Sequence, residues 1–234
     1  MTFACGPLAR IPSVPAIVPA SLAADDSNAI LARVIAPTVY AQRDETFTLE
    51  RVVAIVHPTR RIIAYHLLWR DDAYGAWLPF TKATDAEIVW VGYDATNAPT
   101  DVWTYWHGTI LHTDWTEKGA PAVNVQWGKH GSMPRGTRLE DLPRNKSLRA
   151  FHILSVLGSP DLWLGNLSRP GPWCFCHGYA RYGEFTRPIA LGMRLDAIAR
   201  TSRPAPTLRA VFGDGYTNKR PWPDDRGMGA VPPR

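Results

Sequence analysis

Acidic side chains recur at short spacing in the middle of the chain. Asp85 and Glu87 are two residues apart at the start of a β-rich run, and Asp71 and Asp72 end the strand-like run before it. Residues i and i+2 of a strand project from the same face, and two carboxylates so placed repel each other unless a cation, an arginine or a proton relieves them. We therefore predict a divalent cation, Ca²⁺ or Mg²⁺ before Mn²⁺, at Asp71, Asp72, Asp85 and Glu87. The alternative is that Asp71 and Asp72 form a solvated turn and Asp85 only begins a strand.

Three histidines near these carboxylates are candidates for proton transfer. The stretch from residue 61 to 134 holds four of the seven histidines and seven of the ten tryptophans. An unperturbed imidazole titrates near neutral pH, so we predict acid–base roles for His107, His112 and His130. The alternative for each of them is a structural role with satisfied hydrogen bonds. His66 lies inside an apolar run and is expected in the core or behind the site.

Aromatic and basic residues accompany these histidines along the expected strands. Tryptophan-rich surfaces often stack on sugar rings or flat ligands, whereas large aromatic side chains also fill the cores of β-sandwiches. The sequence leaves both readings open. On the first of them we predict four contacts with a substrate, at Trp103, Tyr105, Trp127 and Lys129.

Three short motifs in this stretch resemble a known family. The runs YHLLWRDD at 65–72, DAE at 85–87 and KHG at 129–131 are similar to motifs of the necrosis-inducing NPP1-like proteins (NLPs) and the related Vps62-like group. The resemblance implies a β-sandwich, secretion, and a divalent cation that supports cytolytic binding to membrane glycolipid headgroups. It places cation ligands at Asp72 or Asp71, Asp85 and Glu87, and it matches His130 with the histidine of a late HG motif.

The resemblance covers roughly a third of the chain, residues 61–134. Where the family carries GHRHDWE, this chain has TKATDAE at 81–87, without the two histidines and the tryptophan. The expected kinship is therefore that of a superfamily rather than of close relatives.

The spacing of apolar runs and turn residues predicts an all-β fold. Short strands separated by Pro, Gly, Asn and Asp are typical of an antiparallel β-sandwich, here with two or three short peripheral helices and irregular ends. We expect one domain at 21–215, after a Pro-rich arm at 1–20 and before a basic Pro/Gly-rich tail at 216–234. The expected strands are 47–56, 62–70, 86–93, 102–108, 121–127, 173–182 and 207–212, and the expected helices are 21–34 and 147–157.

Composition excludes several classes of function. The net charge is +5, and residues 181–234 hold 10 basic and 5 acidic side chains, so the excess lies in the tail. No nucleic-acid-binding motif accompanies it, and nucleic acid is an unlikely partner. Three cysteines give no disulfide framework. We find no membrane span and no clear signal peptide, and no motif of serine hydrolases, nucleotide-binding proteins or zincins. Peripheral membrane contact, secretion and the oligomeric state stay open.

These observations lead to three functional hypotheses. The first is a metal-assisted enzyme, hydrolase-like or lyase-like, that acts on a sugar-containing or other polar substrate in an aromatic-lined cleft. The second is a non-enzymatic, cation-dependent protein that binds a glycan or a lipid headgroup, as the NLP resemblance implies. The third is a purely structural or partner-binding protein.

Overall fold

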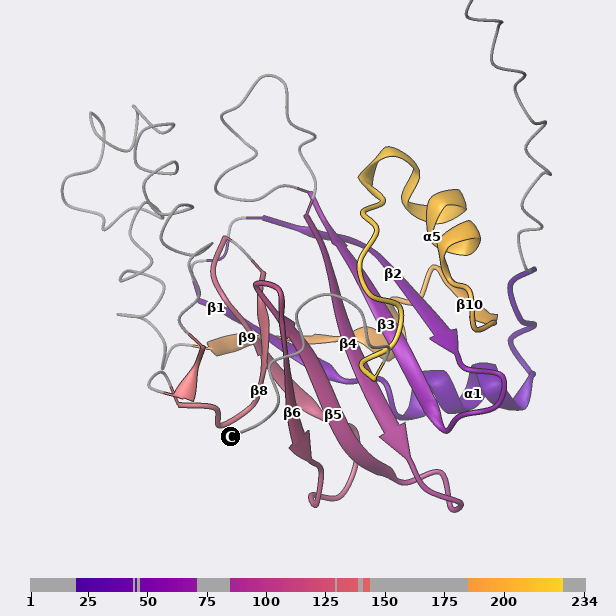
Figure 1. The fold of residues 1–234 in the computed structure, drawn as a ribbon, viewed down its shortest axis with the longest axis horizontal. Coiled ribbons are helices and arrows are strands. Elements are labelled where there is room, and N and C mark those ends of the chain that lie inside the picture. The colour runs from indigo at the N-terminus through magenta and orange to yellow at the C-terminus, as the bar shows by residue number, and fades with distance from the viewer. Residues whose placement is uncertain are drawn as a thin grey trace, which may run out of the picture.

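Two β-sheets packed face to face form the fold, here in a computed structural model (Figure 1). The structure describes residues 20–43, 45, 47–70, 85–128, 130–138, 141–143 and 185–224. Its strands and α-helices are α1 (Ser27–Val34), β1 (Thr38–Gln42), β2 (Leu49–Val56), β3 (Ile62–Trp69), β4 (Asp85–Tyr93), β5 (Pro99–Trp106), β6 (Thr109–Asp114), β7 (Ala122–Val125), β8 (Ser132–Pro134), β9 (Phe185–Ala190), β10 (Ala197–Arg200) and α5 (Ala205–Phe212). One sheet has the order β10-β2-β3-β4-β5-β6 and the other β8-β7-β1-β9.

The predicted β-sandwich is confirmed, with a refinement in strand direction. Consecutive strands from β2 to β6 pair antiparallel, as short connections allow. The β1–β7 and β10–β2 pairs run parallel. The members of these two pairs come from distant parts of the chain, so no hairpin dictates their direction. Both sheets are therefore mixed.

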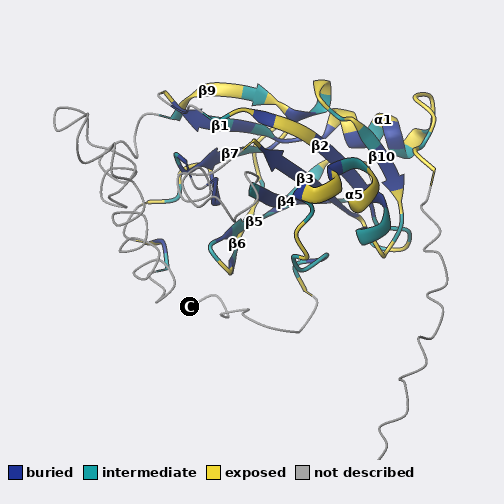
Figure 2. Ribbon diagram, turned by 90° about the horizontal axis from the view of Figure 1, so that it is seen from above, coloured by how far each residue is buried: buried dark blue, intermediate teal, exposed yellow. Residues whose placement is uncertain are grey.

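The central strands of the six-stranded sheet are covered on both faces, as the view from above shows (Figure 2). Its inner face packs on the four-stranded sheet and α1, through Tyr65, Leu67, Val89 and their neighbours. Its outer face packs on α5 and the segment that follows α5. All eight residues of β3 are buried in consequence, which explains why this strand is apolar almost throughout rather than alternating.

Helix α1 begins where the sequence signal places it. The Asp26 side chain caps the helix by accepting from the backbone N–H groups of Asn28, at 2.8 Å, and Ala29, at 3.4 Å. Ala29 and Ala32 face the core. The Tyr65 hydroxyl donates to the Ala32 carbonyl at 2.9 Å and ties the helix to β3. The predicted helix at 21–34 is confirmed from Ser27 onward. The helix predicted at 147–157 and the strand predicted at 173–182 lie outside the described residues.

The prediction of a strand at 207–212 is wrong, because these residues belong to helix α5. Pro204 precedes the helix, and Leu208 and Phe212, four residues apart, bury the same face against the sheet. After α5 the chain crosses the outer face of β3 and β4 (Figure 1). There Trp222 is buried and Trp90 Nε1 donates to the Pro221 carbonyl at 2.9 Å. Packed residues thus continue past residue 215, where the sequence places the start of a tail.

Candidate functional site

His130 lies in the hairpin that joins β7 to β8. Gln126 N–H donates to the Gly131 carbonyl at 3.0 Å, and His130 N–H donates to the Gln126 carbonyl at 3.1 Å. This tight closure holds His130 at a φ of 51°, a left-handed conformation that is uncommon for a residue other than glycine. The turn thereby directs the imidazole inward, into the space between the sheets.

Inside the sandwich, His130 is enclosed by two carboxylates and two aromatic rings. Its Nδ1 lies 3.0 Å from Asp85 Oδ2, and its Nε2 lies 3.7 Å from Glu45 Oε2. The first contact is a hydrogen bond; the second is an ion pair beyond hydrogen-bond distance. The imidazole stacks on Trp69 with centroids 4.2 Å apart and meets Phe47 edge-on. Predicted residues Asp85 and His130 are therefore brought together, although no solvent reaches the ring.

The carboxylates decide the charge of this cluster. Burial alone would lower the pKa of His130, but the hydrogen bond with Asp85 and the attraction of Glu45 raise it to about 9. Burial raises the pKa of Glu45, yet His130 and the N–H groups of Gly128 and Phe47 bring it below its ordinary value. The result is a protonated imidazole between acidic groups, an arrangement that favours a structural role for His130.

His107 lies just beyond the end of β5. It has a φ of 45°, so it leaves the strand, which ends at Trp106 and not at residue 108 as the sequence predicts. Its Nε2 is 2.5 Å from Gln126 Oε1, and its ring lies on Gly131, where an added Cβ would approach Nε2 to 2.9 Å. His107 thus supports the hairpin that carries His130.

Glu87 forms a second ion pair, with Lys219. Because β5 pairs with β4 only from Val89 onward, the first residues of β4 lie beyond that ladder. Glu87 Oε1 is 2.7 Å from Lys219 Nζ, and the ammonium lies 4.7 Å from the centroid of the Tyr105 ring. Burial raises the pKa of Glu87 to about 8, although Lys219 lowers it. Burial would lower the pKa of Lys219, but Glu87 and Asp85 raise it.

A cavity of about 170 Å³ adjoins this ion pair on the outer face of the sheet. Its floor comes from His66, Glu87 and their neighbours on β3 and β4, and its roof from α5 and the segment up to Pro221. Two buried polar atoms of the floor have no hydrogen-bond partner among the described residues, Glu87 Oε2 and His66 Nε2. Burial, with the nearby Lys219 charge, lowers the pKa of His66 to about 3, so its imidazole is neutral.

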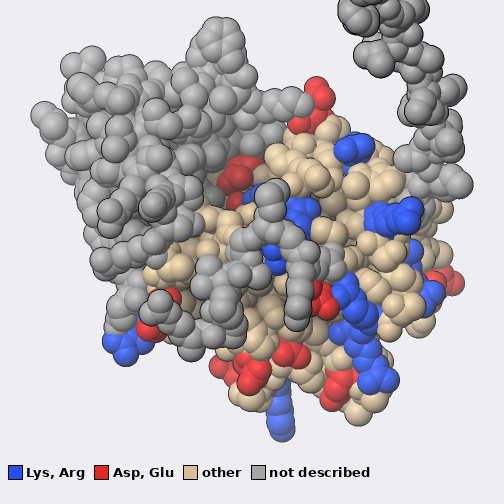
Figure 3. All heavy atoms as spheres, in the orientation of Figure 1, with Lys and Arg blue, Asp and Glu red and all other residues tan. Residues whose placement is uncertain are grey.

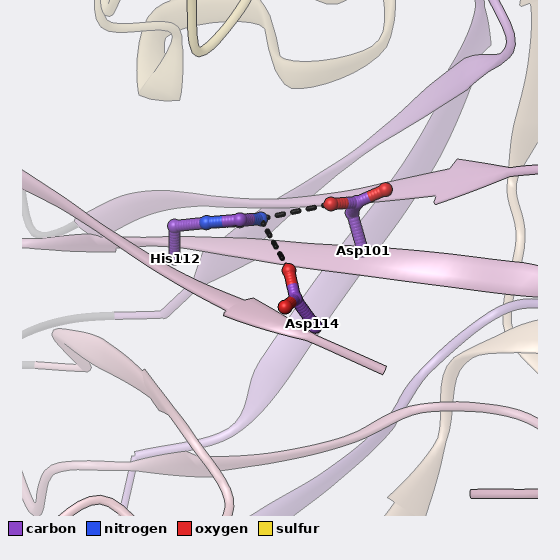
Figure 4. A group of neighbouring side chains, drawn as sticks. All are labelled: Asp101, His112 and Asp114. Carbon is purple, nitrogen blue, oxygen red and sulfur yellow. Dashed lines mark hydrogen bonds and ion pairs between the residues drawn. The ribbon is translucent and has the colours of Figure 1, made fainter. Parts of the chain in front are cut away.

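A third cluster lies near the surface, on β5 and β6 (Figure 4). His112 Nε2 is 2.9 Å from Asp101 Oδ1 and 3.8 Å from Asp114 Oδ1, and its ring stacks on Trp103 at 4.9 Å. Strand pairing sets Trp103 opposite His112 and Asp101 opposite Asp114, which places all four side chains on one face. Their potential ligand atoms converge within 4.8 Å, so this group could hold a metal ion.

Two of the carboxylates predicted to bind a cation face positively charged side chains of the protein instead. Asp85 faces the cationic His130, and Glu87 faces Lys219, so both carboxylates already have a positively charged partner. Asp71 and Asp72 lie outside the described residues. The set of four ligands therefore stays a prediction, and within the described ranges the residues that converge are Asp101, His112 and Asp114.

The predicted substrate contacts divide between two regions. Trp103 and Tyr105 face the outer side, beside His112 and Lys219. Trp127 lies near Phe47, with centroids 6.0 Å apart, next to the buried His130 cluster. Lys129 is not among the described residues. These aromatic residues do not form a single wall, and their role as substrate contacts stays a prediction.

Glu45 and Lys219 escaped the sequence analysis, and His66 was expected only in the core or behind the site. His66 gave a signal, because a polar residue inside an apolar strand needs a partner or a purpose. Glu45 gave no such signal, because it lies in a run of polar residues. Lys219 lies in the stretch that the sequence assigns to a basic tail. Only the return of the chain across the sheet brings Lys219 to Glu87.

Comparison with known proteins gives distant structural likeness. The chain matches no protein-family model and no curated protein. It is similar to NLPPya in complex with mannosamine, with 13% identity over 51% of this chain and 73% of that one and a TM-score of 0.36. NLPPya in complex with glucosamine gives 12% identity, the same coverage and a TM-score of 0.38. A structure described as a toxin fold for microbial attack and plant defense gives 12% identity over 58% of this chain and 84% of that one, with a TM-score of 0.36. The predicted distant resemblance to NLPs is confirmed at this level.

The charges on the surface bear on nucleic-acid binding, and the lengths of the helices bear on membrane insertion. Lysine and arginine are interspersed with acidic residues over the described part of the face in Figure 3, rather than gathered into one basic patch. A nucleic-acid footprint of clustered basic residues is not visible on that face. None of the described helices has the length and apolar character needed to cross a membrane.

Proposed function

We propose that the protein binds a small, hydroxyl-rich polar ligand, about the size of one sugar ring, in the cavity over β3 and β4. One observation carries this proposal. The cavity is lined by Glu87 and His66, and each of them holds a buried polar atom that has no hydrogen-bond partner in the described part of the chain. A ligand within the cavity can supply the partner that these two atoms lack among the described residues.

The energetic argument concerns these two atoms. A buried polar group without a partner costs roughly 1–3 kcal/mol, and such groups are uncommon in folded proteins. A hydroxyl both donates and accepts. It can therefore satisfy Glu87 Oε2 with or without a proton and His66 Nε2 in either tautomer.

The volume of the cavity and the charges that line it limit which class of ligand can bind. The cavity of about 170 Å³ is smaller than the roughly 300–1,000 Å³ of pockets for drug-sized molecules. The Lys219 ammonium opposes a cationic ligand, and Glu87 opposes an anionic one whenever it is ionised. A neutral polyol or sugar suits both states of Glu87. The sugar of a lipid headgroup presents the same chemistry as a free sugar.

Turnover of the bound ligand is a second candidate function. Burial raises the pKa of Glu87 to about 8, and a carboxyl group that titrates near neutral pH can both give and take a proton. A hydrolase-like or lyase-like reaction would use Glu87 for this transfer. The enclosure of His130 between Asp85 and Glu45 is poorly suited to the proton-transfer role that the sequence suggests for it.

Titration calorimetry tests the binding proposal. The panel contains neutral monosaccharides, amino sugars, sugar acids and vesicles with or without a glycosylated lipid. We expect saturable binding of a neutral sugar, free or on the vesicle, and at least tenfold weaker binding by His66→Phe, which keeps a ring but loses Nε2. His112→Phe is the matched control, since it replaces a histidine outside the cavity.

Two results would contradict the proposal: no binding across the panel, or equal affinity of the wild type and His66→Phe. Chromatography of the incubated ligand separates the two candidate functions. Product formed by the wild type and lost in Glu87→Gln supports turnover, whereas an unchanged ligand supports binding alone.

A further inference from the structure

We propose that Lys219 is the internal cation of this cavity. Its ammonium takes the position beside Glu87 that a divalent metal ion would otherwise take, and the cavity therefore excludes divalent cations. A consequence is that ligand binding there needs no metal. That consequence rests on the proposed function, whereas the exclusion of metal does not.

The first support is the distance between the charged groups. A Ca²⁺ ion lies about 2.3–2.6 Å from the oxygens that bind it, and Lys219 Nζ already lies 2.7 Å from Glu87 Oε1. A metal ion on that oxygen would meet a like charge at short range in a buried environment, where Coulomb repulsion is strong. Lys219 must therefore leave before Glu87 Oε1 can accept a metal ion.

The second support is that the neighbouring carboxylate is compensated in the same way. Asp85 Oδ2 lies 3.0 Å from the Nδ1 of a fully buried His130. Two acidic residues on one strand thus receive two cationic partners from distant parts of the chain, the β7–β8 hairpin and the segment after α5. The repulsion between the carboxylates is relieved without a metal ion.

The third support is that Lys219 is held in place. Its ammonium lies over the Tyr105 ring, 4.7 Å from the centroid, a favourable cation–π distance. Its segment is anchored two and three residues later, where Pro221 accepts from Trp90 at 2.9 Å and Trp222 is buried. Lys219 is therefore a fixed part of the cavity wall, unlike a solvated lysine on a tail.

The ammonium also has donors to offer a ligand. A lysine carries three N–H donors, and the contact with Glu87 Oε1 uses one. A ligand hydroxyl could accept from another while it satisfies Glu87 Oε2. The chain itself would thereby supply a contact to a ligand oxygen without a metal ion.

Cation titration without any ligand tests the exclusion of metal. Asp101→Asn first removes a carboxylate from the surface group with His112 and Asp114, so that its metal binding does not mask the cavity. In this background we expect no heat with Ca²⁺ or Mn²⁺ and the same Tm with and without EDTA. Cation binding in this background that Glu87→Gln abolishes would overturn the inference.

Lys219→Met in the same background is the complementary test. The variant keeps an unbranched side chain but loses the charge, so Asp85 and Glu87 face each other with one cation fewer. We expect a lower Tm in EDTA and a rise of roughly 5–10 °C with Mn²⁺ at a hundredfold excess over its dissociation constant. Lys219→Arg, which keeps the charge, should show no such rise. A folded Lys219→Met protein without any gain in cation binding would also count against the inference.

The two proposals fail separately. The titration above uses no sugar, so its outcome is independent of the ligand. If a sugar binds and EDTA abolishes that binding, the proposed function stands and the internal cation is refuted. If no sugar binds but the cation results hold, the reverse is true. If Lys219→Met does not fold, the titration of Asp101→Asn with and without Glu87→Gln still decides.

Discussion

Two histidines of this protein each lie near two carboxylates at similar distances, although the carboxylates contact both ring nitrogens of His130 and only Nε2 of His112. Their surroundings differ. His130 lies 3.0 Å from Asp85 and 3.7 Å from Glu45, with none of its side chain exposed. His112 lies 2.9 Å from Asp101 and 3.8 Å from Asp114, with 37% of its side chain exposed. In both, an imidazole stacks on a tryptophan, Trp69 or Trp103.

The difference teaches that burial decides what such a cluster does. At the surface, water screens the charges, and an ion pair of this kind is worth roughly 0–1 kcal/mol. Between the sheets, the same charges are strongly coupled, and removal of one leaves the others uncompensated. The buried cluster is expected to hold the hairpin and the two sheets together, whereas the exposed cluster is the one that a dissolved metal ion can reach.

The strongest test of this comparison is to remove each histidine in turn. His130→Phe keeps a ring on Trp69 but leaves the buried carboxylates of Asp85 and Glu45 without their cation. We expect a loss of about 3–5 kcal/mol in the free energy of unfolding, measured by urea denaturation. His112→Phe should change it by less than about 0.5 kcal/mol. Equal effects of the two substitutions would remove the basis of the comparison.

The pH dependence of stability tests the comparison of the two clusters further. The pKa of His130 is about 9 in the folded protein and near 6.5 in an unfolded chain. Its contribution is therefore complete below about pH 6.5 and is lost as the pH rises through 9, on the order of 3 kcal/mol in all. Burial raises the pKa of Glu87 from 4.5 to about 8. Glu87 therefore adds its own loss of stability as the pH rises from about 4.5 to 8, below the range in which His130 titrates.

The interval from pH 8 to 9 reports mainly on His130, because most of the Glu87 carboxyl, whose pKa is about 8, is already ionised there. There we expect a fall of roughly 1 kcal/mol in the free energy of unfolding of the wild type and of His112→Phe. The His130→Phe protein should show a much flatter profile. A flat profile of the wild type in this interval would mean that the imidazole is not held protonated.

A smaller effect is expected in the turn that carries His130. In Gly131→Ala the new Cβ would lie 2.9 Å from His107 Nε2 and 3.1 Å from Trp106 Cε3. Such overpacking costs about 1–3 kcal/mol, measured as a lower Tm. In the double variant with His107→Ala the combined loss should be less than the sum of the two single losses. Strict additivity would show that the ring contact is not the cause.

Metal binding should have the smallest effect on stability. It also gives the clearest contrast between the exposed cluster, which a dissolved ion can reach, and the buried one. Carboxylate and imidazole ligands together suit Zn²⁺. Weak Zn²⁺ binding, measured by calorimetry, is expected to disappear in His112→Ala and to persist in a folded variant of the buried cluster such as Glu45→Gln. Loss of Zn²⁺ binding in Glu45→Gln alone would place the accessible ligands in the interior instead.

Local patterns predicted the elements that carry these clusters better than the clusters themselves. The strands around His66, Asp85 and Trp103 follow from runs of β-branched and aromatic residues between turn residues. The pairing of Asp85 with His130 was within reach, since both were candidates for one site. The role of His107 was not, because its departure from the strand depends on the turn after β5 and on Gln126.

Helix α5 and the residues after it show the limit of such patterns. The stretch 207–212 is short and apolar, and such a run fits a strand as well as a helix. Contact of Leu208 and Phe212 with the outer face of the sheet selects the helix. The parallel partners of β1 and β2 also come from far along the chain, beyond what turn signals can indicate.

The sequence by itself determined the class of fold, the central strands and the carboxylates and histidines available for chemistry, because these depend on residue type and on contacts between near neighbours. The tertiary structure alone decided which charges meet. It buried His130 between Asp85 and Glu45, left His112 near the surface, and brought Lys219 across the sheet to Glu87. The physical reason is that the energy of a charge depends on its distance from other charges and from water, and the folded chain sets both.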